Sequence, residues 1–363
     1  MKTIICFICG LGSGGAEHQL SLLSNFLSGR GYKINLVTFS SVADHYPLNK
    51  SIKRIRLGIN KNKIGQLIDI WKFFLTTKSD VVISFGQREN FLCILPLLFR
   101  SKIKIIAGER NTTYGKPSNI EKVLHKVLYG RANYVVPNSY SQEKYIKVNA
   151  PRFTSKVKTI TNYTEIEKFI YTPYPNNHLV RFGVFCRYSK QKNYIRFAKA
   201  IKSIVNKGYD KFIIDWYGDI TYKGTAPNPH YEIFNKLLIE YNLQAYLKLH
   251  DRISDVAFEM SKCDAVILPS LYEGFSNTLS ETICCGRPGL CGNVADNGLM
   301  VQDGINGYLF NPESIEDIAN CIIKFLELPV QNRKMMANNS RERAIKIFNK
   351  TVFLNKYIDL IES

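Results

Sequence analysis

Short apolar stretches alternate with amphipathic helical stretches along this chain, and the alternation runs through the sequence twice. Strands followed by helices in regular order are typical of parallel sheets covered by helices on both faces. In the first series we expect strands at 3–9, 33–39, 80–85, 104–107 and 134–137, and helices at 16–28 and 120–129. In the second we expect strands at 180–186, 212–217, 247–249 and 265–269, and helices at 194–206, 231–241 and 254–262. Turn-rich residues separate the two series, so the sequence predicts an α/β fold of two doubly wound domains.

The length of the chain agrees with two domains. At 363 residues with 45% hydrophobic content, it can form two cores of about 170 residues each. We expect an N-terminal domain at 1–168 and a C-terminal domain at 175–344, with a linker near 165–178. The pattern of residues 333–363 predicts continuous helix.

The apolar segments are too short to cross a membrane. The longest lies near 91–99, whereas a spanning helix needs roughly 18 to 20 residues. The first ten residues predict a strand that leads into a glycine turn, without the cleavage site of a signal peptide. The nine cysteines are scattered and odd in number, which fits reduced thiols. We therefore expect a cytoplasmic protein.

Positive charge is concentrated in the N-terminal half. Residues 1–165 hold 25 Lys and Arg against 9 Asp and Glu, a net +16 out of +19 for the chain. An acid-free basic stretch at 50–63 is followed by apolar residues at helical spacing over 64–75. Such an element can dock on anionic lipid, which predicts peripheral association with the inner membrane face. The alternative is a surface helix that packs its apolar stripe on the sheet.

Two carboxylates follow the strand expected at 265–269. A glycine-bearing loop is expected at 273–276 and a helix start at 277–285. Amide groups at a helix N-terminus favour phosphate, and carboxylates accept hydrogen bonds from hydroxyl groups. Glu273 and Glu281, eight positions apart, can therefore hold a polyhydroxyl ligand beside a diphosphate. The alternative is a pair of exposed acids at a helix entry.

This segment resembles the signature of family 4 glycosyltransferases, which are retaining enzymes with two Rossmann-like domains in the GT-B architecture. The family pattern of Glu-Gly-aromatic and a second Glu is matched by Glu273 and Glu281, before a Gly-x-Pro element at 286–288. The resemblance implies that Glu281 binds the ribose of a nucleotide-sugar donor and that Glu273 lies near the donor sugar. It also implies that a C-terminal helix, at about 345–363, returns to the N-terminal domain. Further implied donor contacts are Gly274, Phe275, Ser276 and Asn277.

Two cations follow the first strand of the second domain. Arg187 and Lys192 are expected at the ligand-binding edge of the sheet, so whatever binds there should be anionic. In the resembling family, the equivalent Arg and Lys stabilise the departing nucleoside diphosphate. Arg187, Lys192 and Glu273 are therefore the expected catalytic residues. Gly218 and Arg252, which follow later strands, are further candidates for donor contact.

Glycines 10, 12 and 15 match the spacing of the dinucleotide-binding fingerprint. The second strand ends without the acid that would bind ribose, which argues against a bound nicotinamide dinucleotide. A glycine turn at a helix N-terminus still allows close approach of phosphate or sugar. Residues 14–17 also resemble the Gly-Gly-Ala-Glu opening of the family, so Gly14 is an acceptor candidate and Gly15 a donor candidate. The alternative is a tight turn alone.

Polar residues end two neighbouring strands of the first domain. They should lie at one edge of the sheet, and the acceptor candidates among them are Arg88, Glu109, Arg110 and Asn111. The Glu-Arg-Asn element resembles a subset of the family that glycosylates polyprenyl-diphosphate-linked sugars, which implies that Arg110 meets the acceptor diphosphate. No histidine stands at these strand ends, where many relatives carry one.

These features predict a retaining glycosyltransferase of glycan or polysaccharide biosynthesis. It would move a hexose or N-acetylhexosamine from a nucleotide-diphosphate sugar, with uridine favoured by family frequency alone, to a lipid-linked saccharide. The chain has no Asp-x-Asp motif, so we expect no obligatory metal and no cofactor. One alternative is a nucleotide-sugar epimerase, which the shortage of candidate histidines disfavours. The other is a non-enzymatic polyanion-binding or nucleic-acid-binding protein, although no nucleic-acid motif is present.

Overall fold

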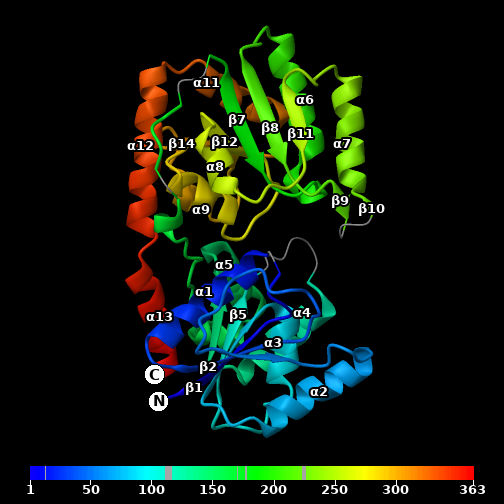
Figure 1. Cartoon of the computed structure of the whole chain (residues 1–363), viewed down its shortest axis with the longest axis vertical. Coiled ribbons are helices and arrows are strands. Elements are labelled where there is room, and N and C mark those ends of the chain that lie inside the picture. The colour runs from blue at the N-terminus through cyan, green and yellow to red at the C-terminus, as the bar shows by residue number, and fades with distance from the viewer. Residues whose placement is uncertain (13, 111–116, 170, 176–177, 223–225) are drawn as a thin grey trace. The chain divides into compact units, whose positions relative to one another are not determined.

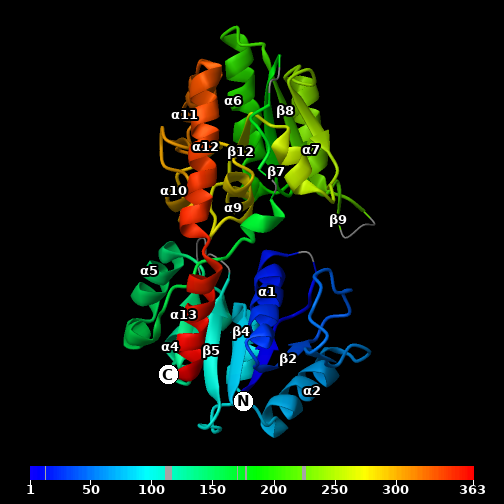
Figure 2. The same ribbon diagram turned by 60° about the vertical axis from the view of Figure 1, so that its left-hand side comes forward.

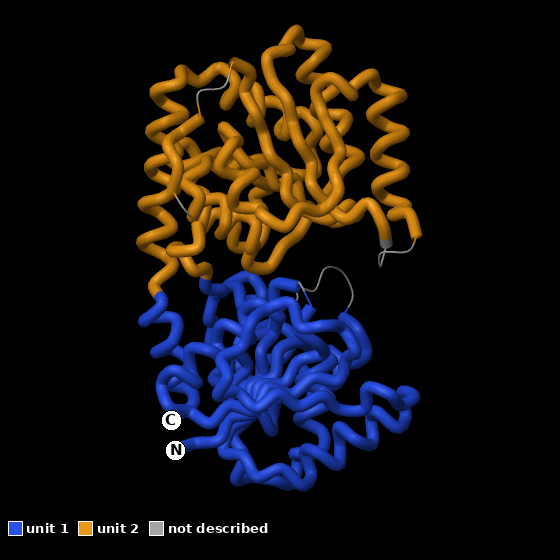
Figure 3. Tube along the Cα trace, viewed as in Figure 1, with its two compact units in different colours: residues 1–163, 350–363 blue, residues 164–349 orange. Residues whose placement is uncertain are grey.

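The computed structural model of the chain describes residues 1–363 apart from 13, 111–116, 170, 176–177 and 223–225. It forms two compact units (Figure 3). Unit 1 holds Met1–Tyr163 and Lys350–Ser363, and unit 2 holds Thr164–Asn349. Each unit contains a parallel six-stranded sheet with helices, which confirms the predicted two-domain α/β fold. None of the described helices is both long and apolar enough to cross a membrane.

The sheet of unit 1 has the strand order β3-β2-β1-β4-β5-β6, and every neighbouring pair is parallel. Its strands are β1 (Thr3–Phe7), β2 (Lys33–Thr38), β3 (Lys53–Arg56), β4 (Val81–Phe85), β5 (Lys104–Glu109) and β6 (Tyr134–Pro137). The order reverses between β1 and β4, so the loops after these strands turn to opposite faces of the sheet. β1 ends two residues before the predicted strand end at Cys9, and β3 was not predicted.

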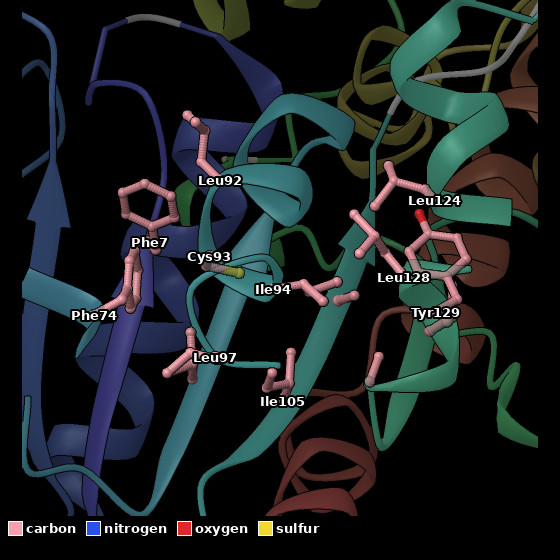
Figure 4. Close-up of a cluster of buried hydrophobic side chains, with 14 of the residues drawn as sticks. Phe7, Phe74, Leu92, Cys93, Ile94, Leu97, Ile105, Leu124, Leu128 and Tyr129 are labelled. Atoms are coloured by element: carbon pink, nitrogen blue, oxygen red, sulfur yellow. The ribbon is translucent and has the colours of Figure 1, made fainter. Parts of the chain in front are cut away.

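Helices cover both faces of this sheet. They are α1 (Gly15–Gly29), α2 (Lys63–Thr76), α3 (Gln87–Ile94), α4 (Asn119–Lys126), α5 (Tyr140–Asn149) and α13 (Lys350–Glu362). Successive side chains of β1 point to opposite faces, as a strand requires. Cys6 meets Ser24 of α1 and lies near Tyr357 of α13. Phe7 packs edge-on against Phe74 of α2 at 5.0 Å between ring centroids (Figure 4).

The C-terminal helix α13 belongs to unit 1 and lies beside α1 (Figure 1). Lys2 donates to the carbonyl oxygen of Ile361 at 2.9 Å and pairs with Glu362 at 2.8 Å. Tyr163 stacks on Phe353 at 5.5 Å between centroids. These contacts join the two ends of the chain, which agrees with the expected return of the last helix to the N-terminal domain.

The sheet of unit 2 repeats the same plan, with the order β11-β8-β7-β12-β13-β14. Its strands are β7 (Val180–Phe185), β8 (Phe212–Tyr217), β11 (Leu247–His250), β12 (Ala265–Leu268), β13 (Gly289–Gly292) and β14 (Gly307–Phe310). All neighbouring pairs are parallel, and the order reverses between β7 and β12. A separate antiparallel pair is formed by β9 (Thr221–Tyr222) and β10 (Ala226–Pro227).

Helices pack around this second sheet in two groups (Figure 1). One group contains α6 (Tyr194–Asn206), α7 (Pro229–Glu240) and α11 (Ile315–Leu326). The other contains α8 (Val256–Ser261), α9 (Asn277–Cys284), α10 (Asn297–Met300) and α12 (Val330–Ile347). The predicted continuous helix over 333–363 is wrong, because α12 ends before Phe348, whose ring packs against Phe275 at 6.3 Å.

A buried arginine binds the segment around Thr172 and Pro173, near the start of unit 2. Arg287 follows the helix α9 and is fully buried. Its Nη2 donates to Thr172 Oγ1 at 2.7 Å and to the carbonyl oxygens of Ser261 at 2.6 Å and Pro173 at 3.3 Å. Its Nη1 donates to the carbonyl oxygen of Gly286 at 3.0 Å. The guanidinium therefore neutralises buried acceptors that would otherwise lack partners.

We expect Arg287→Met to lower the unfolding free energy of unit 2 by roughly 2–4 kcal/mol, because several buried carbonyl groups lose their donor. The measurement is urea unfolding followed by tryptophan fluorescence in a Trp71→Phe background. Buried Trp216 is then the one remaining tryptophan and reports on unit 2. The exposed Lys236→Met in the same unit serves as the control and should change stability by less than about 0.5 kcal/mol. Equal effects of the two substitutions would contradict this account of Arg287.

Candidate active site

The predicted donor residues of unit 2 gather where its strand order reverses. The loop after β7 carries Arg187 and Lys192, and the loop after β12 carries Glu273. Two hydrogen bonds join these loops: Gln191 Nε2 donates to the carbonyl oxygen of Tyr272 at 2.8 Å, and the Leu271 amide donates to the carbonyl oxygen of Gln191 at 2.9 Å. In open α/β sheets, ligands bind at the carboxyl ends of the strands beside such a reversal.

An ion pair spans this reversal. Lys192 Nζ lies 2.5 Å from Glu273 Oε1, and each side chain retains only 11% of its exposure. A partly buried pair of this kind is held by mutual attraction, because each charge would be costly to bury alone. The two residues that sequence analysis connected with catalysis from separate motifs are thus in direct contact. Arg187, five residues before Lys192, is exposed at the same loop.

The helix α9 begins directly after the glycine-bearing loop. Ser276 caps it, with its hydroxyl group accepting from the Leu279 amide at 3.3 Å. Thr278 Oγ1 donates to the carbonyl oxygen of Phe185 at 3.1 Å, which fixes the first turn of α9 against the end of β7. Phe275, the aromatic residue of the loop, is buried and packs near the ring of Phe348. Asn277 therefore stands at a rigid helix N-terminus, where the helix dipole favours an anion.

Glu281 lies on α9, one turn beyond its start. Its carboxyl group is partly buried, and this burial raises its pKa to about 7. Near neutral pH the group therefore exists in both ionisation states. The ionised form is the stronger acceptor of hydroxyl hydrogen bonds, so a ligand that donates such bonds would favour loss of the proton.

The remaining donor candidates of unit 2 lie at the ends of β8 and β11. At Gly218, a Cβ atom would stand 2.6 Å from the carbonyl oxygen of Cys186, so only glycine fits this close approach. Arg252 is exposed and lies 3.7 Å from Asp219. His250, next to it in the sequence, is bonded to Asp215 at 2.7 Å, which gives this histidine a structural partner.

In unit 1 the predicted glycines lie at the other strand reversal, between β1 and β4. Gly14 caps α1, and Gly15 is its first residue. A Cβ atom on Gly14 would meet Glu17 Oε2 at 2.2 Å, so a larger residue there would displace the Glu17 carboxylate. Arg88 is exposed in the first turn of α3, with its guanidinium 4.9 Å from the ring centroid of Phe39.

Of the acceptor candidates, Glu109 is enclosed in the interior of unit 1, whereas Arg110 beside it is partly buried. Glu109 is fully buried and accepts a hydrogen bond from the Tyr129 hydroxyl group. Burial and the nearby Glu121 raise its pKa to about 8, so the group is largely neutral at pH 7. Arg110 donates to the Tyr357 hydroxyl group of α13 and lies 3.7 Å over the Phe85 ring. Asn111 lies outside the described residues.

Sequence analysis did not single out two further acids at the β1–β4 reversal. Glu17 and Glu89 occupy the third position of α1 and α3, and each carboxylate lies over the glycine that caps its helix. Burial raises the pKa of both carboxyl groups, and the nearby charge of Glu17 raises the pKa of Glu89 further. The repeated Gly-x-x-Glu pattern at 14–17 and 86–89 is the signal that could have identified them.

The chain is similar to known glycosyltransferases over most or all of its length. Residues 181–343 match the family described as glycosyl transferases group 1. A Campylobacter jejuni protein is 25% identical over 384 residues, covering 99% of this chain and 98% of its own. Its name is GalNAc-alpha-(1->4)-GalNAc-alpha-(1->3)-diNAcBac-PP-undecaprenol alpha-1,4-N-acetyl-D-galactosaminyltransferase. An Escherichia coli UDP-Gal:alpha-D-GlcNAc-diphosphoundecaprenol alpha-1,3-galactosyltransferase is 26% identical over 228 residues, 57% of this chain and 55% of its own.

A solved structure has the same fold. HepE from Anabaena, in complex with UDP and glucose, superposes with a TM-score of 0.83 at 18% identity and 100% coverage of both chains. At this identity the likeness shows the fold and not the ligand. The match of residues 181–343 to the group 1 model and the named relatives support a glycosyltransferase, and the chain has the GT-B fold, as its resemblance to family 4 predicted.

Proposed function

We propose that this chain transfers a hexose or N-acetylhexosamine from a UDP-sugar to a hydroxyl group of a lipid-linked saccharide, with retention at the anomeric carbon. The observation that carries the proposal is the meeting of Lys192, Glu273 and the N-terminus of α9 at the strand reversal of unit 2. This arrangement offers positive charge for a diphosphate and carboxylates for sugar hydroxyl groups.

In the proposed donor complex, Arg187, Lys192 and the first turn of α9 hold the diphosphate. Glu281 accepts hydrogen bonds from the ribose, and Glu273 accepts them from the donor sugar. Because Glu273 already pairs with Lys192, donor binding would exchange part of this ion pair for contacts with sugar and phosphate. In the empty site the two charges stabilise each other, and in the filled site each would gain a specific contact with the ligand.

The chemical step requires stabilisation of the negative charge on the departing UDP. Arg187, Lys192 and the α9 dipole would supply it, without an obligatory metal ion. For a retaining reaction on one face of the sugar, the leaving phosphate itself can take the proton of the acceptor hydroxyl group. The main tasks of the protein are then to position both substrates and to supply fixed positive charge.

For the acceptor, the proposal rests on similar proteins and on charge. Both relatives described above carry a diphospho-undecaprenol acceptor in their names. Unit 1 holds most of the net positive charge of the chain, which suits an anionic membrane surface. All nine cysteines are free thiols, as in a reducing compartment. We therefore include peripheral association with the cytoplasmic membrane face in the proposal.

A calorimetric comparison of UDP, GDP, ADP and UMP tests the donor class. We expect saturable binding of UDP in preference to the others, weakened at least tenfold by Glu281→Ala and by Arg187→Ala. The exposed Lys236→Ala is the control. Binding of none of the four nucleotides would refute the donor site. Turnover of a UDP-sugar to its epimer without any acceptor would instead support the epimerase alternative.

The phosphate contacts can be separated from the sugar contacts by comparing UDP with UMP. In wild type the second phosphate should strengthen binding, because Lys192 contacts it. We expect Lys192→Met to reduce the ratio of UDP to UMP affinity about tenfold, the value of one charge-assisted hydrogen bond. Glu273→Gln should not lower the ratio, since its carboxylate is proposed to contact the sugar and otherwise only competes with phosphate for Lys192. If both substitutions reduce the ratio equally, the two residues do not have the separate roles proposed here.

The raised pKa of Glu281 predicts a pH dependence of nucleotide affinity. At pH 6 most of this group is protonated, and at pH 8 most is ionised, since its pKa is about 7. The ionised form accepts the ribose hydrogen bonds, so UDP affinity should rise with pH by up to about tenfold across this range. Glu281→Gln removes this contribution while the phosphate ionisation of UDP is unchanged. The measured quantity is the wild-type to variant affinity ratio, and a ratio independent of pH would contradict the role of Glu281.

A further inference from the structure

The helix α2 exposes a continuous apolar stripe. Ile64 is 72% exposed and Ile68 59% exposed. The exposed apolar members of the helix are Ile64, Leu67, Ile68, Trp71 and Leu75. At 3.6 residues per turn they lie within an arc of about 100°, and the 14 residues of α2 extend over about 21 Å. Figures 1 and 2 show α2 at the rim of unit 1, with no described element of this unit over its outer side.

This stripe is separate from the face that packs on the sheet. Ile70 and Phe74 are buried and belong to one hydrophobic cluster of unit 1. Figure 4 shows Phe74 in that cluster. The outward stripe is therefore a second apolar face that the core does not use. The alternative stated from the sequence, in which the whole apolar pattern packs on the sheet, does not hold for Ile64, Ile68 and Leu75, which are more than half exposed.

A turn bonded to the C-terminal end of α2 carries a further exposed apolar residue. Phe99 is 97% exposed, an extreme value for a phenylalanine. The next residue, Arg100, donates from Nη1 to the carbonyl oxygens of Phe74 and Leu75, at 2.9 Å each. These bonds fix the turn that carries Phe99 against the last turn of α2. The outward stripe together with Phe99 is called the α2 surface below.

The α2 surface is surrounded by cations. The sole acid of the helix, Asp69, is paired with Lys61 at 2.8 Å. Exposed lysines stand near both ends of the helix and within it: Lys63, Lys72, Lys78 and Lys102. The basic stretch before the helix contributes less than its sequence suggested, because Arg54 and Arg56 both pair with Asp44.

We propose that the α2 surface is a membrane-binding element, which inserts its apolar side chains at the surface of a bilayer rich in anionic lipid. Aliphatic residues and a tryptophan flanked by lysines fit the boundary between acyl chains and negatively charged headgroups. A second copy of this chain is the less favourable occupant, since apposed α2 surfaces would bring their lysines together. This inference rests on the proposed function, because an enzyme that acts on a lipid-linked acceptor must work at the membrane surface.

Trp71 provides a direct test, because it lies in the stripe and Trp216 is the one other tryptophan. In a Trp216→Phe background, vesicles of phosphatidylcholine and phosphatidylglycerol (3:1) should shift Trp71 emission to the blue and protect it from acrylamide. Vesicles of phosphatidylcholine alone should have a much smaller effect. If the protein binds the anionic vesicles while Trp71 remains fully accessible to acrylamide, the proposal is refuted.

Cosedimentation with the same vesicles then compares two matched variants in the wild-type background. The α2 variant carries Ile64→Gln, Ile68→Gln and Trp71→Gln, and should bind at least about tenfold more weakly than wild type. The control carries Ile195→Gln, Ile233→Gln and Ile239→Gln, exposed isoleucines of unit 2, and should bind as wild type does. Equal binding by both variants would refute the proposal.

Two further readouts separate the possible failures. UDP affinity of the α2 variant should equal that of wild type, so loss of vesicle binding cannot be attributed to a damaged donor site. Failure of UDP binding with intact vesicle binding would refute the proposed function and leave the α2 surface standing. Protection of Trp71 that depends on protein concentration, without vesicles, would identify a second copy as the occupant and overturn the lipid proposal.

Discussion

The reversal of strand order between β7 and β12 is the constraint on which the candidate donor site depends. Loops that leave two neighbouring parallel strands in opposite directions cannot cover the sheet edge between them. In this chain one loop contributes Lys192 and the other Glu273, and their ion pair fills that edge. The hydrogen bonds from Gln191 to Tyr272 and from Thr278 to Phe185 hold these segments beside each other. Sheet topology thus determines which distant residues of the sequence become neighbours.

Partial burial determines the chemical character of the acids in both units. Glu273 has a cation within 2.5 Å, whereas burial alone raises the pKa of Glu281. Glu109 is enclosed further, with the Tyr129 hydroxyl group as its donor. Removing a carboxylate from water favours its neutral form, and a nearby cation reverses that preference. Burial therefore raises the pKa of both Glu281 and Glu109, but only Glu281 remains partly exposed and so accessible to a ligand.

Much of the fold could be predicted from the sequence because strand and helix patterns are local. The strands at 134–137 and 212–217 and the helix at 194–206 have the predicted bounds. The interior position of Glu109 and the contact made by Arg110 could not be predicted, since they depend on Tyr129 and Tyr357, which lie 20 and 247 positions away. The break at Phe348 likewise depends on a contact with Phe275. Glu89 escaped notice because its significance requires the neighbouring strand that brings Glu17 close.

For the helix α2 as well, the local sequence pattern did not predict which apolar residues are buried, and here the difference bears on function. Eight of its residues are large and apolar, including Phe73 on the side of the core, and together they cover an arc too wide for one sheet contact. Periodicity establishes the amphipathic pattern but not which part of it the sheet will bury. Ile70 and Phe74 are buried and Phe73 packs against the same cluster, whereas Ile64, Ile68 and Leu75 are more than half exposed. Such exposure reduces solubility, and flanking lysines offset that effect while also favouring an anionic surface. Apolar area and positive charge on one helix are therefore best explained together, by a partner that satisfies both.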